Sequence, residues 1–445
     1  MEIAPGRYAR VNGGASKGRS CSPVRSPAAI LKAMPEIPFW TQDSLEDIVS
    51  ARSKIMGAGV WAAARPDDRP VISFAGGLPD VPSLPDDELL RATRAVLDTE
   101  RREALQYGGT FGPQPLREAI AERSAGIEGI PLTAEHVTVT SGAAHGIGIA
   151  SEVLIDPGDT VLVESPTFPG SLRTFVSFGA QVEAVPMDDE GLRVDLAEEA
   201  LKRLADKGRR AKLLYLIPTH QNPVGSTMPR ARRERLLELA REHRVLIMED
   251  DAYGELWFGD EPPPPSLFSL SGGELAIKVA SFSKIIATGL RLGWNLAPPT
   301  LITRMAALRY DMGSSPYLGR AVAEMIRNGD LDRHVERLRA IYRRKLDRLC
   351  EAIDEHCDDY VTYQRPGGGF FVWLGLHQGL SAIEVQRVAN EKGVLIGAGP
   401  HFFADGNATQ HLRLAFSYTP VEEIEEGAHR LGEALREVAA SSPVK

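Results

Sequence analysis

Residues 279–294 read VASFSKIIATGLRLGW. An apolar, strand-like run ends beside Ser281 and Ser283, Lys284 follows at once, and Arg291 comes seven residues later. Burying a free ammonium group is costly, whereas an amine that forms an imine with an aldehyde loses its localised charge. Serine hydroxyls and a guanidinium fork suit a phosphate. The stretch predicts an α/β sheet that holds a phosphorylated aldehyde on Lys284; the alternative is a surface lysine in a Ser/Gly loop.

A second strand, in residues 244–256 (RVLIMEDDAYGEL), places Asp250 and Tyr253 just beyond four apolar residues. A carboxylate buried there needs a cationic partner. The ring nitrogen of a pyridinium cofactor would provide one, and Tyr253 would hydrogen-bond the ring oxygen. Alternatively, the acidic pair caps a helix, as Asp251 would.

Three further strands lead to polar or flat side chains, and open α/β sheets bind ligands beyond the carboxyl ends of their strands. In TSGAAHG (140–146), the small residues Ser141, Ala143 and Ala144 open a helix whose N–H groups would face an anion. ESPTFPG (164–170) offers Phe168 as a stacking face, and PTHQNPVG (218–225) offers Asn222 as a donor to the ring oxygen. We therefore expect one site shared by five strands.

Apolar runs that alternate with helical segments predict an α/β fold with a largely parallel sheet. Buried strands are predicted at 136–140, 159–164, 212–217, 244–250 and 276–282, and a helix follows Pro229. We expect a tail at 1–34, a segment at 35–75 that joins a small α+β domain, a large cofactor-binding domain at 76–328 and the small domain at 329–445. A long amphipathic helix from Leu331 to Ile353 opens the small domain.

The composition of the chain argues against several classes of function. The formal charge is −9 and hydrophobic residues make up 43% of the chain, without a run long enough for a membrane span. We expect no nucleic-acid partner, since such proteins need a basic face. Three irregularly spaced cysteines predict no metal site and suit a reducing, cytoplasmic location. Residues 1–34 are basic and rich in Gly, Ser and Pro, which favours a disordered tail over a transit peptide.

Eight motifs together resemble the class I and II aminotransferases of pyridoxal-phosphate (PLP) fold type I, in particular the 2-aminoadipate and kynurenine aminotransferase branch. They occur in family order and span about Phe74 to Tyr418: FAGGLPD, QYGGTFGPQPLREAI, TSGAAHG, ESPTF, THQNPVG, EDDAYGEL, SFSKIIATGLRLGW and HLRLAFSY. The resemblance implies a large domain with a mostly parallel seven-stranded sheet sandwiched by helices, plus a smaller α+β domain.

The resemblance also implies residue roles. Lys284 would be the Schiff-base lysine and proton carrier, Asp250 the partner of the pyridine nitrogen, and Arg413 the clamp for the substrate α-carboxylate, with Gly77 and Asn222 nearby. The implied cofactor-binding residues are Tyr107, Ser141, Ala143, Ala144, Phe168, Asn222, Asp250, Tyr253, Ser281, Ser283, Lys284 and Arg291. Tyr107 would reach the phosphate of the neighbouring subunit, which implies a homodimer with shared sites. Phe168 stands where many relatives carry tyrosine, so one hydrogen bond is lost there.

These expectations describe PLP-dependent transfer of an amino group from an L-amino acid to a 2-oxo acid. The alternative is a PLP enzyme of the same fold that performs elimination, replacement, cyclisation or oxidation, because fold does not fix reaction type. A regulator built on this domain is disfavoured, since about 35 residues precede the fold and a winged helix needs more.

Overall fold

The computed structural model describes residues 46–56, 71–377, 379–406 and 410–441. The chain forms two compact units, Met1–Lys54 and Ile55–Lys445. The described part of the first unit is short and includes the start of helix α3 (Ala51–Met56), whose residues 51–54 are exposed. The predicted tail at 1–34 lies outside the described residues. All further description concerns the second unit.

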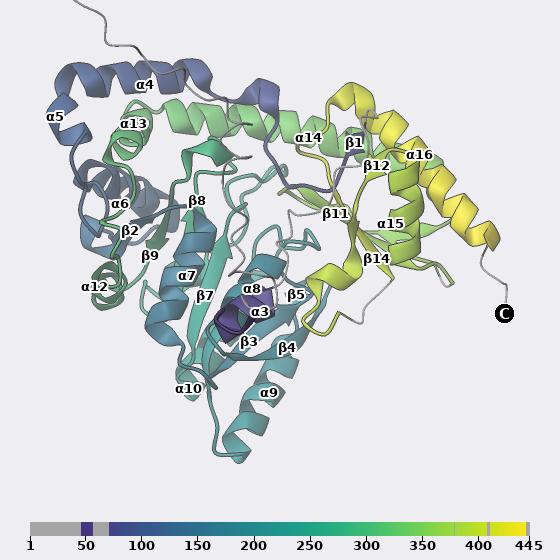
Figure 1. Ribbon diagram of the computed structural model, residues 1–445, viewed down its shortest axis with the longest axis horizontal. Helices are drawn as coiled ribbons and strands as arrows, with labels where there is room; N and C mark the ends of the chain where they lie inside the picture. The colour runs from purple at the N-terminus through teal and green to yellow at the C-terminus, as the bar shows by residue number, and fades with distance from the viewer. Residues whose placement is uncertain (1–45, 57–70, 378, 407–409, 442–445) are drawn as a thin grey trace, which may run out of the picture. The chain divides into compact units, whose positions relative to one another are not determined.

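An eight-stranded sheet forms the centre of the larger lobe, in the order β2-β9-β8-β7-β6-β3-β4-β5 (Figure 1). Its strands are β2 (Val137–Thr140), β3 (Thr160–Ser165), β4 (Gln181–Asp188), β5 (Gly191–Leu192), β6 (Ala211–Leu216), β7 (Leu246–Asp251), β8 (Ala276–Ser281) and β9 (Gly293–Leu296). Strands β4, β3, β6, β7 and β8 are mutually parallel, while β9 runs antiparallel to both of its neighbours. The mostly parallel sheet is confirmed; β5 extends the seven expected strands by a two-residue hairpin partner of β4.

Helices cover both faces of this sheet because both faces of its central strands are apolar. One face packs a cluster that includes Ile147, Val163 and Ile277; the other joins the main core through Leu162, Leu214 and Ile247. The helices of this lobe are α4 (Asp86–Thr99), α5 (Arg101–Ala104), α6 (Gln114–Glu128), α7 (Ala143–Leu154), α8 (Pro169–Ser177), α9 (Val194–Asp206), α10 (Arg230–His243), α11 (Leu267–Leu270), α12 (Pro299–Ala307) and α13 (Pro316–Arg327). The 3₁₀ turns are η1 (Val81–Ser83), η2 (Ala134–His136) and η3 (Thr288–Leu290).

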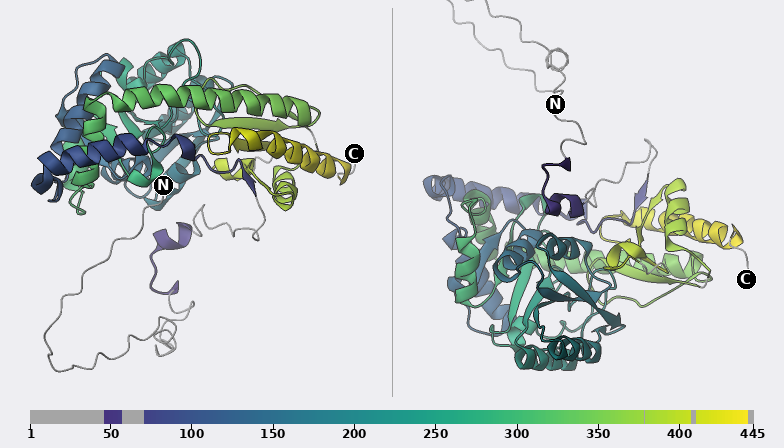
Figure 2. Two further views of the ribbon diagram at one scale, coloured as in Figure 1. Left: turned by 90° about the horizontal axis from the view of Figure 1, so that it is seen from above. Right: turned by 60° about the horizontal axis from the view of Figure 1, so that its bottom comes forward.

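A second, antiparallel sheet has the order β10-β11-β14-β13 and is drawn in light green and yellow in Figure 2. Its strands are β10 (Val361–Tyr363), β11 (Phe371–Leu376), β13 (Gly397–Ala398) and β14 (His411–Ala415). It is accompanied by α14 (Asp330–His356), α15 (Ala382–Glu391), η4 (Gly399–Phe402) and α16 (Val421–Ser441). Strand β1 (Ile72–Ser73) pairs in parallel with β12 (Val394–Leu395). The residues that precede the larger lobe in the sequence therefore pair with the C-terminal part of the chain.

The five strands expected from the sequence are present, with ends shifted by at most two residues, and the expected long helix is α14, which begins one residue earlier and ends three residues later than expected. The expected helix after Pro229 is α10, which ends where Arg244 adopts a left-handed conformation with φ of 53°. Within the described ranges no helix is both long and apolar enough to cross a membrane. The proposed domain boundaries remain a prediction.

Candidate active site

Lys284 follows β8 and points to the loop that precedes η1. Its Nζ donates a hydrogen bond of 2.6 Å to the carbonyl oxygen of Gly77 and lies 5.9 Å from the ring centroid of Phe370. Burial, together with the nearby guanidinium groups of Arg413 and Arg291, lowers the pKa of the Lys284 amine to about 8. A substantial fraction of this amine is therefore neutral near pH 8, as a nucleophile must be.

Asp250 ends β7 in a buried position, 5% exposed. Its Oδ2 accepts a hydrogen bond of 2.7 Å from the Tyr215 hydroxyl, whereas Oδ1 has no partner among the described residues. Burial raises the pKa of Asp250 to about 6, and the Tyr215 hydrogen bond opposes that rise. A buried carboxylate oxygen without a donor is costly, so this side chain is suited to a cationic N–H.

A cradle for a phosphate lies between β8, η3 and α7. The Oγ atoms of the buried residues Ser281 and Ser283 are 2.9 Å apart. Arg291, in a left-handed conformation, donates to the carbonyl oxygen of Ser141 at 2.9 Å. Gly142 has a φ of 94°, which L side chains rarely adopt, and a Cβ atom there would stand 2.8 Å from the Arg291 Nη2, so a substitution would be strained and would displace the guanidinium. The cradle thus gathers two hydroxyls and one guanidinium.

The first turn of α7 supplies the remaining donors. Gly142, with φ of 94°, precedes the helix, and the N–H groups of Ala143 and Ala144 have no carbonyl oxygen one turn earlier. The Ser141 N–H instead donates to Nδ1 of His145 at 3.0 Å. Because the backbone N–H of Ser141 is already engaged by His145, we expect its side chain to be the group that contacts a phosphate.

Arg413, on β14, is held between two aromatic rings. Its Cζ lies 4.3 Å from the ring centroid of Phe371 and 4.7 Å from that of Phe402. Its Nη1 donates to Oδ1 of Asn222 at 2.9 Å, and its Nη2 donates to the Ala75 carbonyl oxygen at 2.5 Å. Nε has no partner among the described residues. Burial lowers the pKa of Arg413 to about 10, so the group remains a cation at neutral pH.

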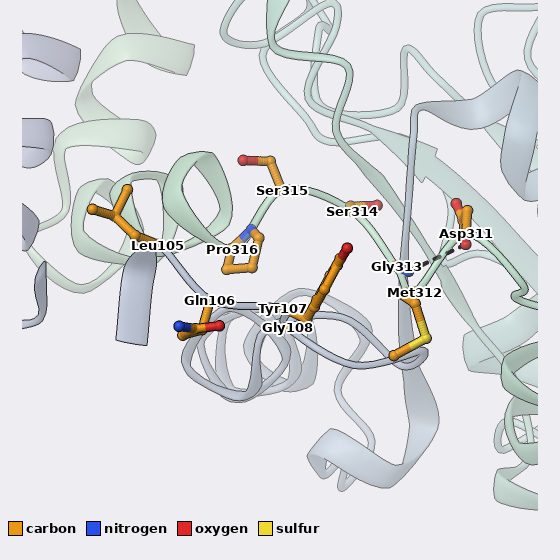
Figure 3. A pocket seen from close by; sticks show the side chains of 10 residues that line it. All are labelled: Leu105, Gln106, Tyr107, Gly108, Asp311, Met312, Gly313, Ser314, Ser315 and Pro316. Atoms are coloured by element: carbon orange, nitrogen blue, oxygen red, sulfur yellow. Dashed lines mark hydrogen bonds between the residues drawn. The ribbon is translucent and has the colours of Figure 1, made fainter. Parts of the chain in front are cut away.

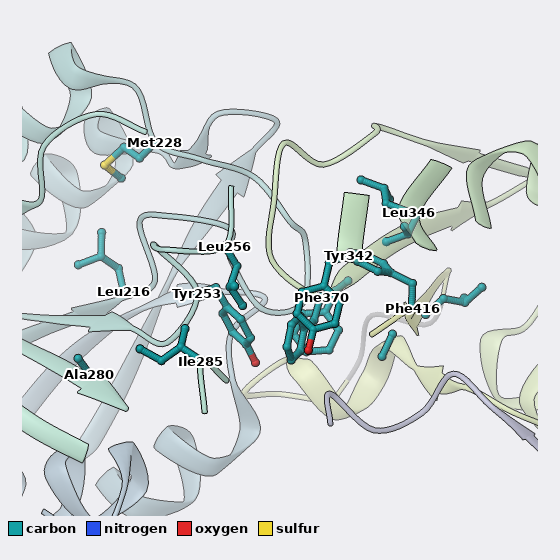
Figure 4. Packing of buried hydrophobic residues seen from close by; sticks show 14 of the residues in the cluster. Leu216, Met228, Tyr253, Leu256, Ala280, Ile285, Tyr342, Leu346, Phe370 and Phe416 are labelled. Carbon is teal, nitrogen blue, oxygen red and sulfur yellow. The ribbon is translucent and has the colours of Figure 1, made fainter. Parts of the chain in front are cut away.

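Tyr253 and Phe168 are the two aromatic residues that the sequence predicts beside the cofactor ring. Tyr253 is buried and packs against Phe370 and Phe371, with ring centroids 5.4 and 5.5 Å away, as Figure 4 shows for Phe370. Burial raises the pKa of its hydroxyl. Phe168 precedes α8 and is half-buried, with its ring over Gly170, where a Cβ atom would meet it at 2.5 Å. Their closeness to the cofactor remains a prediction.

Tyr107 differs from the other predicted residues because it is 81% exposed. It lines a separate pocket formed by 105–108 and 311–316 (Figure 3). Gly77, by contrast, lies at the centre: its carbonyl oxygen binds Lys284, and a Cβ there would stand 2.6 Å from Phe371. The structure therefore joins Lys284, Gly77, Asn222 and Arg413 through hydrogen bonds and leaves Tyr107 apart.

The residues present fit pyridoxal phosphate. The amine of Lys284 matches the aldehyde, the unpartnered Oδ1 of Asp250 matches the pyridinium N–H, and the Ser281, Ser283 and Arg291 cradle matches the phosphate. Together with the mostly parallel sheet, this arrangement defines a PLP enzyme of fold type I. When bound, PLP supplies an electrophilic carbon and a ring that accepts electrons from the substrate α-carbon.

Comparisons with known proteins agree. The model of the family "Aminotransferase class I and II" matches residues 69–431. Aromatic-amino-acid aminotransferase 1 of Thermococcus litoralis is 37% identical over 82% of this chain and 88% of its own length, and 2-aminoadipate transaminase of Thermus thermophilus is 37% identical over 83% and 91%. The crystal structure of α-aminoadipate aminotransferase from Thermus thermophilus, complexed with N-(5'-phosphopyridoxyl)-L-leucine, is similar with a TM-score of 0.82, 34% identity, and coverage of 89% of this chain and 99% of that one.

The chain belongs to the class I and II aminotransferase family. It is a PLP-dependent transferase that moves amino groups between amino acids and oxo acids. The fold class, the family and the cofactor expected from the sequence are thereby confirmed.

Three residues around the site were missed by sequence reasoning. Tyr215, inside β6, binds Asp250, and Phe371 and Phe402 sandwich Arg413. A buried tyrosine hydroxyl always needs a partner, and this was the available signal for Tyr215. The two phenylalanines look like ordinary core residues in the sequence.

The lowered pKa of Lys284 leads to a first prediction. Only the neutral amine attacks an aldehyde, so the rate at which cofactor-free enzyme regains its visible absorbance with PLP should rise with pH and level off above about 8. Stopped-flow absorbance between pH 6 and 9.5 measures it, with Lys284→Arg as the control that gains no such band. A rate independent of pH would contradict the assignment.

Proposed function

We propose that Lys284, Asp250 and Arg413 perform transamination of an L-α-amino acid with a 2-oxo acid. The observation that carries the proposal is the loop Ala75–Gly77, whose carbonyl oxygens bind the Arg413 guanidinium at one residue and the Lys284 amine two residues later. The loop thus positions the Arg413 guanidinium, which would bind a carboxylate, next to the Lys284 amine, which would carry a proton.

Each residue then has a defined task. Arg413 binds the substrate α-carboxylate through its planar fork, with Asn222 and the two phenylalanine rings fixing its orientation. Lys284 would act as the base that removes the proton from the substrate α-carbon. With the cofactor bound, Asp250 would hold the ring nitrogen in its protonated form, and Tyr253 and Asn222 would contact the ring oxygen. The phosphate is bound by Ser281, Ser283, Arg291, the N–H groups of Ala143 and Ala144, and the side chain of Ser141.

The test adds an amino donor and then an amino acceptor to the enzyme and measures visible absorbance after each addition. Purified holoenzyme should lose its visible band with a suitable L-amino acid and regain it with a 2-oxo acid. Since the relatives are named for aromatic amino acids and 2-aminoadipate, the donor panel should include phenylalanine, tyrosine, kynurenine and 2-aminoadipate. Ammonia or a cyclised product without recovery of the band would instead indicate one of the other PLP reactions.

We further propose a cytoplasmic homodimer with shared sites. Exposed large side chains occur in the two segments that line the Tyr107 pocket of about 290 Å³: Leu105 is 67% exposed and Met312 46% (Figure 3). Tyr310, which precedes the pocket residue Asp311 in the sequence, is 85% exposed. Contiguous exposed apolar side chains are typical of an interaction surface. A second copy would cover them, and the Tyr107 hydroxyl would then reach the partner's phosphate.

Subunit mixing tests the shared site. Tyr107→Ala and Lys284→Ala should each be impaired, but an equilibrated mixture should regain activity, because one site of each mixed dimer combines an intact lysine with the other subunit's intact tyrosine. Sedimentation should give twice the 48.4 kDa of one chain. A monomer, or a mixture no more active than its components, would contradict the proposal.

A further inference from the structure

Glu164, the penultimate residue of β3, is a buried acid for which the reaction has no direct task. It is 1% exposed, and its Oε1 accepts three hydrogen bonds: from the N–H of Ile217 at 2.9 Å, from Nε2 of Gln221 at 2.8 Å and from the Thr167 hydroxyl at 3.4 Å. Buried polar groups are normally hydrogen-bonded, and at Glu164 three donors from three different residues converge on one oxygen. Glu164 therefore ties the end of its own strand to the loop that follows β6.

Gln221 completes this connection. It is also 1% exposed, and its Nε2 donates both to Glu164 and to the Pro166 carbonyl oxygen at 2.9 Å. Its Oε1 accepts from the Val224 N–H at 2.8 Å. The two side chains thus cross-link loop 165–168 to loop 221–225. We call the Glu164 and Gln221 pair the loop clamp.

Each of the two loops that the clamp joins is connected to Arg413, one directly and one through Phe402. Asn222, next to Gln221, accepts the hydrogen bond from the Arg413 Nη1. In the other loop, the Thr167 N–H donates to the Phe402 carbonyl oxygen at 2.8 Å, and the Phe402 ring packs on the Arg413 guanidinium. The loop clamp therefore joins the two loops that make these contacts, and no hydrogen bond connects Glu164 or Gln221 to Arg413 itself.

We propose that Glu164 and Gln221 are positioning residues that orient Arg413 and so set the affinity of the enzyme for the substrate α-carboxylate. The inference rests on the proposed role of Arg413. It predicts an effect on carboxylate binding that exceeds the effect on the chemical step, because Lys284 and Asp250 are held by other partners, Gly77 and Tyr215.

The clamp works through hydrogen-bond acceptance, not through charge. All three donors reach the same oxygen of Glu164, and a glutamine at this position keeps that oxygen. Burial also raises the pKa of Glu164 to about 8, so its carboxyl group is mostly uncharged at neutral pH. Glu164→Gln should consequently behave like the wild type, whereas Glu164→Ala and Gln221→Leu should not.

A matched control lies at the other end of the same strand. Thr160 is 3% exposed, and its Oγ1 accepts from Nη2 of Arg209 at 2.8 Å. Thr160→Val removes a buried hydrogen bond from β3 while keeping the side-chain shape. It reports what a general loss of stability in this strand does to the enzyme.

The experiment measures KM and kcat of the holoenzymes, together with calorimetric binding of 3-phenylpropanoate and hexanedioate, the acids that remain when phenylalanine and 2-aminoadipate lose their amino groups. In Glu164→Ala and Gln221→Leu, KM and the acid Kd should rise about tenfold while kcat changes less than about threefold. Glu164→Gln and Thr160→Val should stay within about twofold on both measures. Binding of 3-phenylpropanamide, which lacks the carboxylate, should not change.

Several results would overturn the inference: unchanged KM in Glu164→Ala and Gln221→Leu, a fall in kcat alone, an equal loss in Thr160→Val, or an equal loss in Glu164→Gln. If Glu164→Ala does not fold, Gln221→Leu compared with Glu164→Gln decides. A wild type that binds neither acid and turns over no donor would instead refute the proposed function.

Discussion

Lys284→Ala is expected to lower kcat by at least about 10³-fold, because it removes both the covalent attachment of the cofactor and the group that moves the substrate proton. Lys284 is the lysine that donates to the Gly77 carbonyl oxygen, and the neighbouring Arg413, whose pKa burial lowers only to about 10, stays protonated at neutral pH and cannot serve as the base. Single-turnover absorbance with the best donor measures the loss.

The matched control for this variant is Lys202→Ala, in which an exposed lysine paired with Glu198 is removed. It should retain full activity. Since Lys284 lies beside a backbone carbonyl and not in a buried ion pair, Lys284→Ala should also keep its thermal stability. A stable, cofactor-bound Lys284→Ala enzyme with normal turnover would show that another residue carries the chemistry.

Asp250→Asn is expected to have the second largest effect, a fall in kcat of about 10²- to 10⁴-fold. Asparagine keeps the shape and can still accept the Tyr215 hydrogen bond, but it has no negative charge to keep the ring nitrogen protonated. The ring then accepts electrons poorly from the substrate. Steady-state kinetics, with absorbance spectra of the bound cofactor across pH 5 to 9, measure the effect.

Two outcomes separate this role from a structural one. Asp159→Asn, which weakens a half-buried ion pair with Lys212 at the opposite end of the sheet, should leave kcat unchanged. Asp250→Asn should also fold, because Asp250 forms no salt bridge with the described residues and its Oδ1 has no hydrogen-bond partner among them. Equal turnover of Asp250→Asn and wild type would contradict the pairing with the ring nitrogen.

Local sequence patterns predicted the buried strands well, because runs such as KLLYLI at 212–217 leave little choice once both faces are apolar. Strand β4 was not placed: its residues QVEAVPMD mix polar and apolar side chains, and Gln181 and Pro186 are exposed. Strand β9 has only the four residues GWNL, too few to show a period.

The residues of the candidate site also fall into those that the sequence could predict and those that it could not. Lys284, Asp250 and Asn222 could be found because each lies at or within a few residues of the carboxyl end of an apolar strand, and Arg413 because its motif resembles the family. Tyr215 and the loop clamp could not, since their roles depend on the packing of side chains from adjacent strands and loops. The two hydrogen bonds that Nε2 of Gln221 donates join residues 55 and 57 positions apart in the sequence, a separation that no local pattern encodes.

The most direct measurement locates the cofactor on the chain. Holoenzyme reduced with borohydride, digested and analysed by mass spectrometry should carry the phosphopyridoxyl group on the peptide containing Lys284, at a stoichiometry near one per chain. Addition of an amino donor before the reductant should abolish this labelling. A phosphopyridoxyl group on another lysine, or none on residue 284 in active enzyme, would contradict the account.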